Sequence, residues 1–363
     1  MKHRLIATAA AAAALTLTLA GCSDSPDTGS SAGTGAATGS GVTGSIKASG
    51  SSAQKNAMAE WINSFQSANP GATIDYQANG SGAGIQDFIN NQTAFAGSDA
   101  AMKPDEKTAA DKRCTGGEAI NIPMVGGAIA LAYNVQGVDK LVLTPEVIAG
   151  IFDSSITKWN DPAIAKLNPE AALPDATIAQ FHRSDESGTT ANFTSYLAAT
   201  ASKDWTYEVG KAWSAPGGQG AKGSDGIASS VSQTTNAIGY VELSFIEDGG
   251  LKAAMVDNGG GPVEATSDNA AKAIEGATIV GTGADLALEL DPTIKDPGAY
   301  PIVLVTYQIT CSTGLAADQL AVVKPFLQYA ASDAGQGLLN GIGYVPITGE
   351  LLTKVNTTVT GLS

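Results

Sequence analysis

One local pattern occurs three times in this chain and limits the folds available to it. A β-prone segment runs into a loop of serine or threonine and glycine, and a helix-prone segment follows. The three loops are residues 50–53, 80–84 and 187–189. Strand–loop–helix units in succession favour a parallel sheet, because a parallel connection needs a crossover that is usually a helix. The sequence therefore predicts the α/β fold class.

Hydrophobic spacing predicts the individual elements. Met58, Trp61, Ile62 and Phe65 recur at i, i+3, i+4 and i+7, which marks one face of a helix ending near 69–71. The residues of 120–134 are mostly Val, Ile, Ala and Gly, and we expect a buried strand that crosses between domains. The other expected strands are 45–49, 72–78, 178–181, 237–241 and 300–310, and the other expected helices are those around Ile85 and Phe88, 145–152, 162–167, around Phe193, Tyr196 and Leu197, 325–329, and around Leu338.

The three loops also predict a chemistry. Backbone N–H groups in the first turn of a helix have no partner inside the helix, and the helix dipole adds partial positive charge there. Glycine allows close approach of a ligand, and a serine or threonine hydroxyl adds a donor. For any single loop, the plain N-cap is the favoured interpretation. Three such loops in one chain, with Arg183 four residues before Ser187, predict a shared anion site.

Arg183 and Asp99 carry the charges of this expected site. Arg183 is either a surface cation or a forked donor to the anion, and we favour the forked donor, with Asp185 holding it in place. Asp99 follows a predicted strand in the string Ala-Gly-Ser-Asp-Ala. It is either an N-cap or a carboxylate that touches the anion. Since a carboxylate only accepts hydrogen bonds, it would take the proton of hydrogen phosphate and repel sulfate, which has none.

The strings around these residues resemble those of the phosphate-binding lipoproteins that serve high-affinity phosphate ABC importers. The resemblance runs from about residue 45 to the C-terminus. It implies a two-domain Venus-flytrap fold, of the type II periplasmic-binding-protein kind, with a two-stranded hinge and phosphate in the cleft. Domain I would comprise 45–127 and 305–363, and domain II 128–304. The matching strings are 50–53, 80–82, 96–100, 159–169, 183–189 and 237–242.

The same resemblance implies a set of ligand contacts. Asp99 would be the acceptor, with Asp185 orienting Arg183, and neither a metal nor a cofactor would be needed. Ala53 stands where relatives often carry a larger side chain, but only its N–H is required. Glu186 stands where many relatives have glycine, and we expect it to face solvent. The implied phosphate donors are Ser52, the Ala53 amide, Ser81, Arg183, Ser187, the Gly188 amide and Thr189.

The N-terminal segment predicts where the protein works. Lys2 and Arg4 precede an apolar stretch, 5–20, which ends in Leu-Ala-Gly-Cys at Cys22. This resembles the lipobox of bacterial lipoproteins and predicts a signal peptide over 1–21, an acylated Cys22 and a flexible linker over 22–44. The alternative is an ordinary signal peptide that happens to contain a cysteine. We expect an extracytoplasmic protein that is anchored to the cell membrane by its lipid.

Two further cysteines remain, Cys114 and Cys311. In an oxidising compartment they form either a disulfide or two buried thiols, and we favour the disulfide. If the resemblance holds, both lie in domain I, and their bond would join its two chain segments without blocking the hinge.

The net charge of the sequence limits which binding partners the protein can have. The formal charge is −15, and loss of Lys2 and Arg4 with the leader would make the mature chain more negative. Nucleic acid is therefore not expected as a partner. An anion site would have to act through local donors, because the overall field repels anions. The expected partners are hydrogen or dihydrogen phosphate and the transmembrane permease subunits of an importer, with the receptor itself a monomer.

Three other functions are compatible with a secreted chain of this kind. A secreted phosphatase would depend on His182, the one histidine after the leader, and the chain has no HExxH motif or metal-spaced cluster. A binding protein for sulfate or molybdate is disfavoured by Asp99. A structural or adhesive lipoprotein would be expected to show repeats or aromatic patches, which the sequence lacks. We therefore predict a binding protein without enzymatic activity.

Overall fold

The computed structural model describes residues 41–247 and 250–363. The predicted signal peptide over 1–21, Cys22 and nearly all of the predicted linker over 22–44 lie outside the described residues. Among the residues described, no helix is both long and apolar enough to cross a membrane.

A ten-stranded sheet organises these residues, with the main order β2-β1-β3-β14-β4-β8-β6-β7. The pairs β1–β2, β1–β3, β6–β7 and β6–β8 are parallel, which confirms the predicted α/β class. The strands of this path are β1 (Thr43–Gly50), β2 (Gly71–Gln77), β3 (Phe95–Ser98), β4 (Ala119–Asn134), β6 (Ala179–Arg183), β7 (Gln219–Ala221), β8 (Ala237–Glu242) and β14 (Val303–Cys311).

Two of these strands, β4 and β14, connect the two ends of the sheet, and we call them the crossing strands. The first part of β4, Ala119 to Ala128, pairs with β14 in antiparallel register. Its last part, Ile129 to Asn134, pairs with β8. The expectation of a buried strand crossing over 120–134 is therefore confirmed: all but the last residue of β4 are buried.

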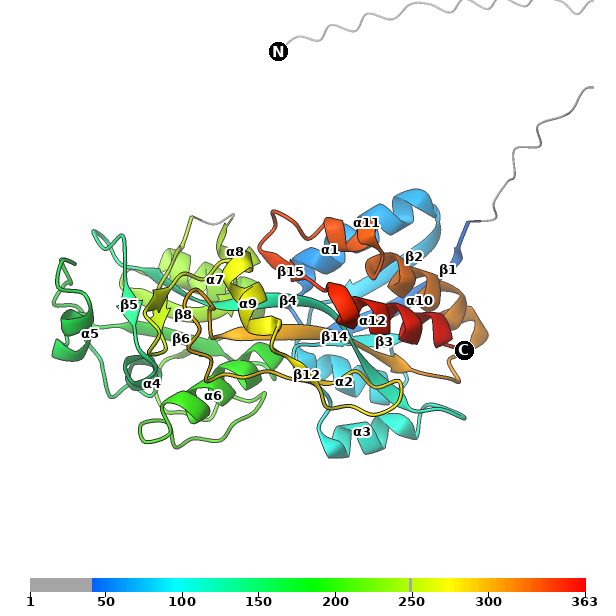
Figure 1. The fold of residues 1–363 in the computed structure, drawn as a ribbon, viewed down its shortest axis with the longest axis horizontal. Helices are drawn as coiled ribbons and strands as arrows, with labels where there is room; N and C mark the ends of the chain where they lie inside the picture. The colour runs from blue at the N-terminus through cyan, green and yellow to red at the C-terminus, as the bar shows by residue number, and fades with distance from the viewer. Residues whose placement is uncertain (1–40, 248–249) are drawn as a thin grey trace, which may run out of the picture. The chain divides into compact units, whose positions relative to one another are not determined.

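Helices cover the sheet on both sides of the crossing strands (Figure 1). The helices are α1 (Lys55–Ala68), α2 (Ser81–Ile89), α3 (Pro104–Asp111), α4 (Pro145–Phe152), α5 (Pro162–Leu167), α6 (Gly188–Thr200), α7 (Gly223–Gln233), α8 (Ser244–Glu247), α9 (Ser267–Ile274), α10 (Ala317–Ala330), α11 (Asp333–Gly337) and α12 (Gly349–Gly361). The shorter strands are β5 (Val142–Leu143), β9 (Lys252–Ala253), β10 (Met255–Asp257), β11 (Pro262–Val263), β12 (Thr278–Ile279), β13 (Leu288–Glu289) and β15 (Tyr344–Pro346).

We call the elements around β1, β2 and β3 the first lobe, and those around β6, β7 and β8 the second lobe. The first lobe contains both the first strand of the described residues and the C-terminal helices: α10 packs on β1 and α1, as Figure 1 shows. Its aromatic core joins Phe65 and Phe326, whose ring centroids lie 5.5 Å apart. The second lobe has its own aromatic core, in which Phe152 and Phe193 lie 4.9 Å apart.

The predicted helices 145–152 and 162–167 have the bounds of α4 and α5. Two expected elements differ in length. The helix expected over 325–329 begins eight residues earlier, at Ala317, because α10 continues through Pro325 while Val322, Val323 and Phe326 are buried. The strand expected from residue 300 begins at Val303.

The structure contains the expected disulfide. Cys114 follows α3 and Cys311 ends β14, and their Cα atoms lie 5.3 Å apart. The bond joins two parts of the first lobe that are separated by 197 positions in the sequence.

Candidate anion-binding site

The loop between β6 and α6 places a cation at the boundary between the lobes. Arg183, the last residue of β6, is 2 % exposed. Its Nε and Nη2 contact the two carboxylate oxygens of Asp185 at 2.8 and 2.5 Å, so the Nη1 amino group lies outside this pair. The Arg183 backbone amide donates to the Tyr240 hydroxyl at 3.0 Å. Burial raises the pKa of Tyr240 to about 12, so this hydroxyl stays neutral.

Ser187 begins α6 as its N-cap, and its side chain accepts the Thr190 amide at 3.3 Å. The plain capping role therefore exists at this loop. It uses the Ser187 hydroxyl as an acceptor and leaves its proton available for another partner.

The carboxyl group of Asp99 lies at the end of β3, 2 % exposed. Three hydroxyl groups donate to it. Ser51, from the turn before α1, contacts Oδ1, and Thr306, from β14, contacts the same oxygen at 3.2 Å. Thr189, from the second lobe, donates to Oδ2 at 3.0 Å. Asp99 is thus an acceptor surrounded by donors from both lobes.

Two serines of the first lobe meet backbone amides of the second. The Ser81 hydroxyl accepts the Gly188 amide at 3.0 Å and also the Asp99 amide at 3.3 Å. The Ser52 hydroxyl accepts the Ser224 amide at 2.9 Å and lies 3.1 Å from the Ser224 hydroxyl. Hydroxyls and amides at three helix beginnings, α2, α6 and α7, therefore converge on one buried region.

Close approach of the lobes needs glycine at Gly80. Its φ of +106° belongs to a region that side-chain-bearing residues rarely adopt, and an added Cβ would lie 2.5 Å from a carboxylate oxygen of Asp185. Glycine in this loop lets the opposite lobe approach the backbone.

The two aspartates of the site have opposite pKa shifts. Burial raises the pKa of Asp99 above its ordinary value, although the Ser51 hydrogen bond and the charge of Arg183 act against the shift. Burial also acts upward on Asp185, but its hydrogen bonds with Arg183 and the charge of that guanidinium hold its pKa below the ordinary value. Asp185 is therefore a fixed anion that neutralises Arg183, whereas the Asp99 carboxylate has a higher affinity for a proton than an ordinary aspartate.

Ion pairs join the lobes on both sides of this region. Lys211, 4 % exposed, pairs with Glu106 of α3 at 2.5 Å, and its carbonyl accepts the Ser187 amide at 2.9 Å. On the other side, Lys55 of α1 pairs with Asp225 of α7 at 2.8 Å, and both of these side chains are exposed.

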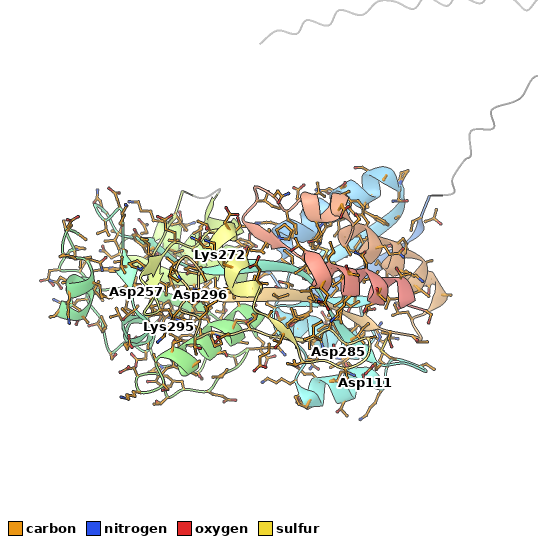
Figure 2. The ribbon with its side chains drawn as sticks, in the orientation of Figure 1. Asp111, Asp257, Lys272, Asp285, Lys295 and Asp296 are labelled. Atoms are coloured by element: carbon orange, nitrogen blue, oxygen red, sulfur yellow. A yellow bond between two sulfur atoms is a disulfide. The ribbon has the colours of Figure 1, made fainter. Side chains whose placement is uncertain are left out.

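Hydrogen bonds within the first lobe fix the segment that follows Asp99. The Met102 amide, three residues beyond Asp99, donates to the side-chain oxygen of Asn121 at 3.1 Å. Asp285 fixes this side chain by accepting both the Asn121 amide and its Nδ2 at 2.8 Å. Asp111 accepts the Ala119 amide at 2.8 Å, and Figure 2 shows Asp111 and Asp285 near one another at this end of β4.

The structure brings the sequence-predicted residues into one region, with one difference in local detail. Helix α1 begins at Lys55, so Ser52 and Ala53 lie in the turn before it, and the Ala53 amide donates to the Ser51 hydroxyl at 3.0 Å. Glu186 is exposed, as expected. The residues described at the boundary are Ser52, Ala53, Ser81, Asp99, Arg183, Ser187, Gly188 and Thr189, all of them buried.

Sequence reasoning missed three contacting residues: Ser51, Ser224 and Thr306. Ser51 lay in a predicted loop but received no role. Ser224 belongs to a fourth strand–loop–helix unit, β7–α7, whose strand has only three residues. Thr306 lies inside buried strand β14, where it alternates with Gln308 and Thr310; this period-two run of polar residues is the signal that could have found it. Residues 41–247 and 250–363 contain no cluster of three or more potential metal ligands.

Comparison with known proteins places the chain in a family. A profile of the PBP superfamily domain matches residues 35–334. Phosphate-binding protein PstS 3 of Mycobacterium tuberculosis is 45 % identical over 322 residues, covering 88 % of this chain and 86 % of that protein. Phosphate-binding protein PstS 2 of the same organism is 38 % identical over 359 residues, covering 97 % and 96 %.

Solved structures agree on the fold. A phosphate-binding protein from Stenotrophomonas maltophilia aligns with a TM-score of 0.66 at 18 % identity, covering 86 % of this chain and 93 % of that one. An ABC-type phosphate transport receptor from Vibrio cholerae aligns with a TM-score of 0.54 at 20 % identity, covering 83 % and 100 %. The expected two-domain fold of periplasmic binding proteins is confirmed, and the chain belongs to the PBP superfamily and, within it, to the PstS family of phosphate-binding proteins.

Proposed function

We propose that this protein is the extracytoplasmic receptor of a phosphate ABC importer: it binds inorganic phosphate between its lobes and delivers it unchanged to a transmembrane permease. The observation that carries the proposal is the Asp99 carboxyl, buried among hydroxyl donors from both lobes. An acceptor among so many donors suits an oxyanion that still carries a proton. The relatives described above are phosphate-binding proteins, which supports the same ligand.

In the proposed site, Arg183 and the three helix beginnings supply the positive end of each contact. The Nη1 group of Arg183, the amides of Ala53 and Gly188, and the hydroxyls of the first and second lobes donate to the phosphate oxygens. Asp99 accepts the phosphate proton. The full set of proposed ligand contacts is Ser52, Ala53, Ser81, Asp99, Arg183, Ser187, Gly188 and Thr189.

Selectivity follows from the Asp99 carboxyl. Sulfate offers no proton at neutral pH, so a buried carboxylate beside it is a repulsion without a compensating hydrogen bond. Phosphate contacts with both lobes favour the closed arrangement, and binding would shift a pre-existing equilibrium between open and closed forms.

The lobes, on this proposal, correspond to domain I at 45–127 and 305–363 and domain II at 128–304. We also propose that the protein acts as a monomer held at the outer face of the membrane by a lipid on Cys22. The expected extracytoplasmic location suits a receptor that meets phosphate before the permease does.

The direct test is calorimetric titration of residues 41–363, cleared of bound phosphate, first with phosphate and then with sulfate. We expect one-to-one binding of phosphate and no heat with sulfate. Equal binding of sulfate would overturn the role of Asp99, and no binding of either ion at two temperatures would overturn the receptor proposal. A chromogenic phosphate ester should give no turnover; sustained turnover would indicate a phosphatase.

A further inference from the structure

The end of β8 carries a buried carboxyl group that the proposed anion site does not use. Glu242 is fully buried and pairs in register with Ile129 of β4. Gly127, two residues earlier in β4, makes room for it, since an added Cβ there would lie 2.9 Å from the Glu242 Oε1 atom. This carboxyl therefore sits where β4 changes its partner from β14 to β8.

A continuous set of contacts leads from this carboxyl to the turn before α1. The Ser244 amide and hydroxyl contact the Oε2 atom of Glu242 at 3.0 and 2.5 Å. The Ser244 hydroxyl lies 3.0 Å from the Tyr344 hydroxyl, which donates to the Ala53 carbonyl at 2.5 Å. Asn56 donates to the Ser244 hydroxyl at 3.0 Å. The second lobe thus reaches the backbone of a proposed ligand contact through three side chains.

Each hydroxyl has one proton to donate, and this fixes the direction in which the hydrogen bonds between Glu242 and Ala53 run. With a proton on Oε2, Glu242 donates to Ser244, Ser244 donates to Tyr344, and Tyr344 donates to Ala53. With Glu242 ionised, the Ser244 proton turns toward the carboxylate, and the Tyr344 oxygen loses the Ser244 donor. The ionised form would also leave a charged oxygen unsatisfied, because Oε1 has no hydrogen-bond partner among the described residues.

The surroundings favour the neutral acid. Burial raises the pKa of Glu242 well above its ordinary value; the hydrogen bonds with Ser244 act downward, and the charge of Asp99 acts upward. The titratable groups facing Glu242 are Tyr344 from β15 and Asp99 from the end of β3. Within 41–247 and 250–363, no lysine or arginine forms an ion pair with it.

We propose that Glu242 is a positioning residue: as a neutral acid it orients the Ser244 and Tyr344 hydroxyls, and these fix the turn that presents Ser52 and Ala53. The Tyr344 hydroxyl also accepts from the Ala57 amide, so it contacts both the turn before α1 and the first turn of that helix. The effect on affinity rests on the proposed phosphate site, whereas the effect on the turn does not.

The test compares Tyr344→Phe with Tyr300→Phe. Both remove one buried hydroxyl that donates to a backbone carbonyl, but Tyr300 contacts Ile129 and has no link to α1. In Tyr344→Phe we expect amide hydrogen exchange at 53–58 to rise about tenfold and phosphate affinity to fall about tenfold. In Tyr300→Phe, both should stay within about twofold of the parent chain. If Tyr344→Phe does not fold, Ser244→Ala removes the preceding hydroxyl of the same series of hydrogen bonds.

Glu242→Gln separates a neutral donor from a mere space-filler. The amide nitrogen keeps a donor for the Ser244 hydroxyl but cannot accept the Ser244 amide as Oε2 does, so exchange at 53–58 and affinity at neutral pH should stay within about threefold of the parent chain. As pH rises, the parent should lose affinity relative to Glu242→Gln, and this ratio cancels the titration of phosphate itself. Unchanged exchange in Tyr344→Phe, or a Glu242→Gln chain as weak as Tyr344→Phe, would overturn the proposal. If the parent chain bound no phosphate, the proposed function would be wrong. The hydrogen-exchange data would still test the positioning role of Glu242.

Discussion

The two lobes bring the same residue type to the site and give it opposite chemistry. In the second lobe, Asp185 is held ionised by Arg183, and the pair is close to neutral as a unit. In the first lobe, the direct contacts of the Asp99 carboxyl within residues 41–247 and 250–363 are hydroxyl donors, and burial raises its pKa. The second lobe therefore forms one wall of the site, with a cation held in place by Asp185. The first lobe forms the other wall, with a proton acceptor. A protonated oxyanion is complementary to both walls, whereas a fully deprotonated one is complementary only to the second.

The largest effect is expected from Arg183→Ala, which removes the cation and leaves Asp185 buried without its partner. Phosphate affinity should fall about 1,000-fold, since charge-assisted hydrogen bonds contribute about 1.5–3 kcal/mol each. Arg113→Ala is the matched control, because that guanidinium lies 4.0 Å from the Phe88 ring in the first lobe and contributes nothing to the site. Calorimetry with a parallel melting curve measures both. A loss of less than tenfold would show that the second wall does not depend on this cation.

Replacing Asp99 with asparagine should remove the ability of the first lobe to distinguish a protonated oxyanion from a fully deprotonated one. We expect the preference for phosphate over sulfate to drop about 100-fold, because the repulsion toward sulfate disappears. Asp225→Asn, at an exposed carboxylate of the lobe boundary, serves as the control. Competition between the two ions in calorimetry gives the ratio, and unchanged discrimination would refute the role of Asp99.

Asp99→Asn should also change the stability of the fold. The folded-state pKa of Asp99 is raised, so between the unfolded and the folded pKa the folded chain binds more protons at this group than the unfolded chain does. Stability contributed by this group is present below the unfolded pKa and falls as pH rises toward the folded pKa. At pH 7, Asp99→Asn should therefore melt at a higher temperature than the parent chain, and a lower melting temperature would contradict the shift.

Ser81→Ala tests a contact that joins the two walls. The Ser81 hydroxyl accepts two amides, one from each lobe, and its loss leaves both without an acceptor. Phosphate affinity should fall about tenfold, the value of one to two buried hydrogen bonds. Ser214→Ala, whose hydroxyl is exposed and contacts Glu208, should have no effect in the same titration.

The smallest effects are expected from the ion pairs between the lobes. Glu106→Gln should speed phosphate release about fivefold, because it weakens a buried pair that also holds the carbonyl of Lys211 against Ser187. Lys55→Met breaks an exposed pair and should change release by less than about twofold. Stopped-flow chase experiments resolve the two, and equal effects would show that burial does not distinguish them.

Local signals explain why much of this arrangement could be predicted. Apolar spacing located α1, and the bounds of α4 and α5 follow from Pro145 and Pro162 at their first positions. The loops near Ser52, Ser81 and Ser187 could be identified because each one couples a serine to a helix that begins within a few residues. Short-range pattern was sufficient for these elements.

Contacts set by pairing of distant strands could not be predicted in this way. Thr306 reaches Asp99 only because β14 lies between β3 and β4, which depends on antiparallel register across about half the chain. The continuation of α10 through Pro325 depends on packing of its buried face, which outweighs the local preference against proline. The chain from Glu242 to Ala53 joins four segments and has no sequence period at all.

The disulfide has a mechanical consequence. Tension applied between β1 and α12 would pass from Cys114 to Cys311 through the covalent bond, so the intervening chain would carry no load. The bypassed loop of 197 positions corresponds to about 700 Å of extended polypeptide. Under a pull, the second lobe would remain slack and folded while the first lobe bore the force. Reduction of this one bond would bring the whole molecule into the path of the tension.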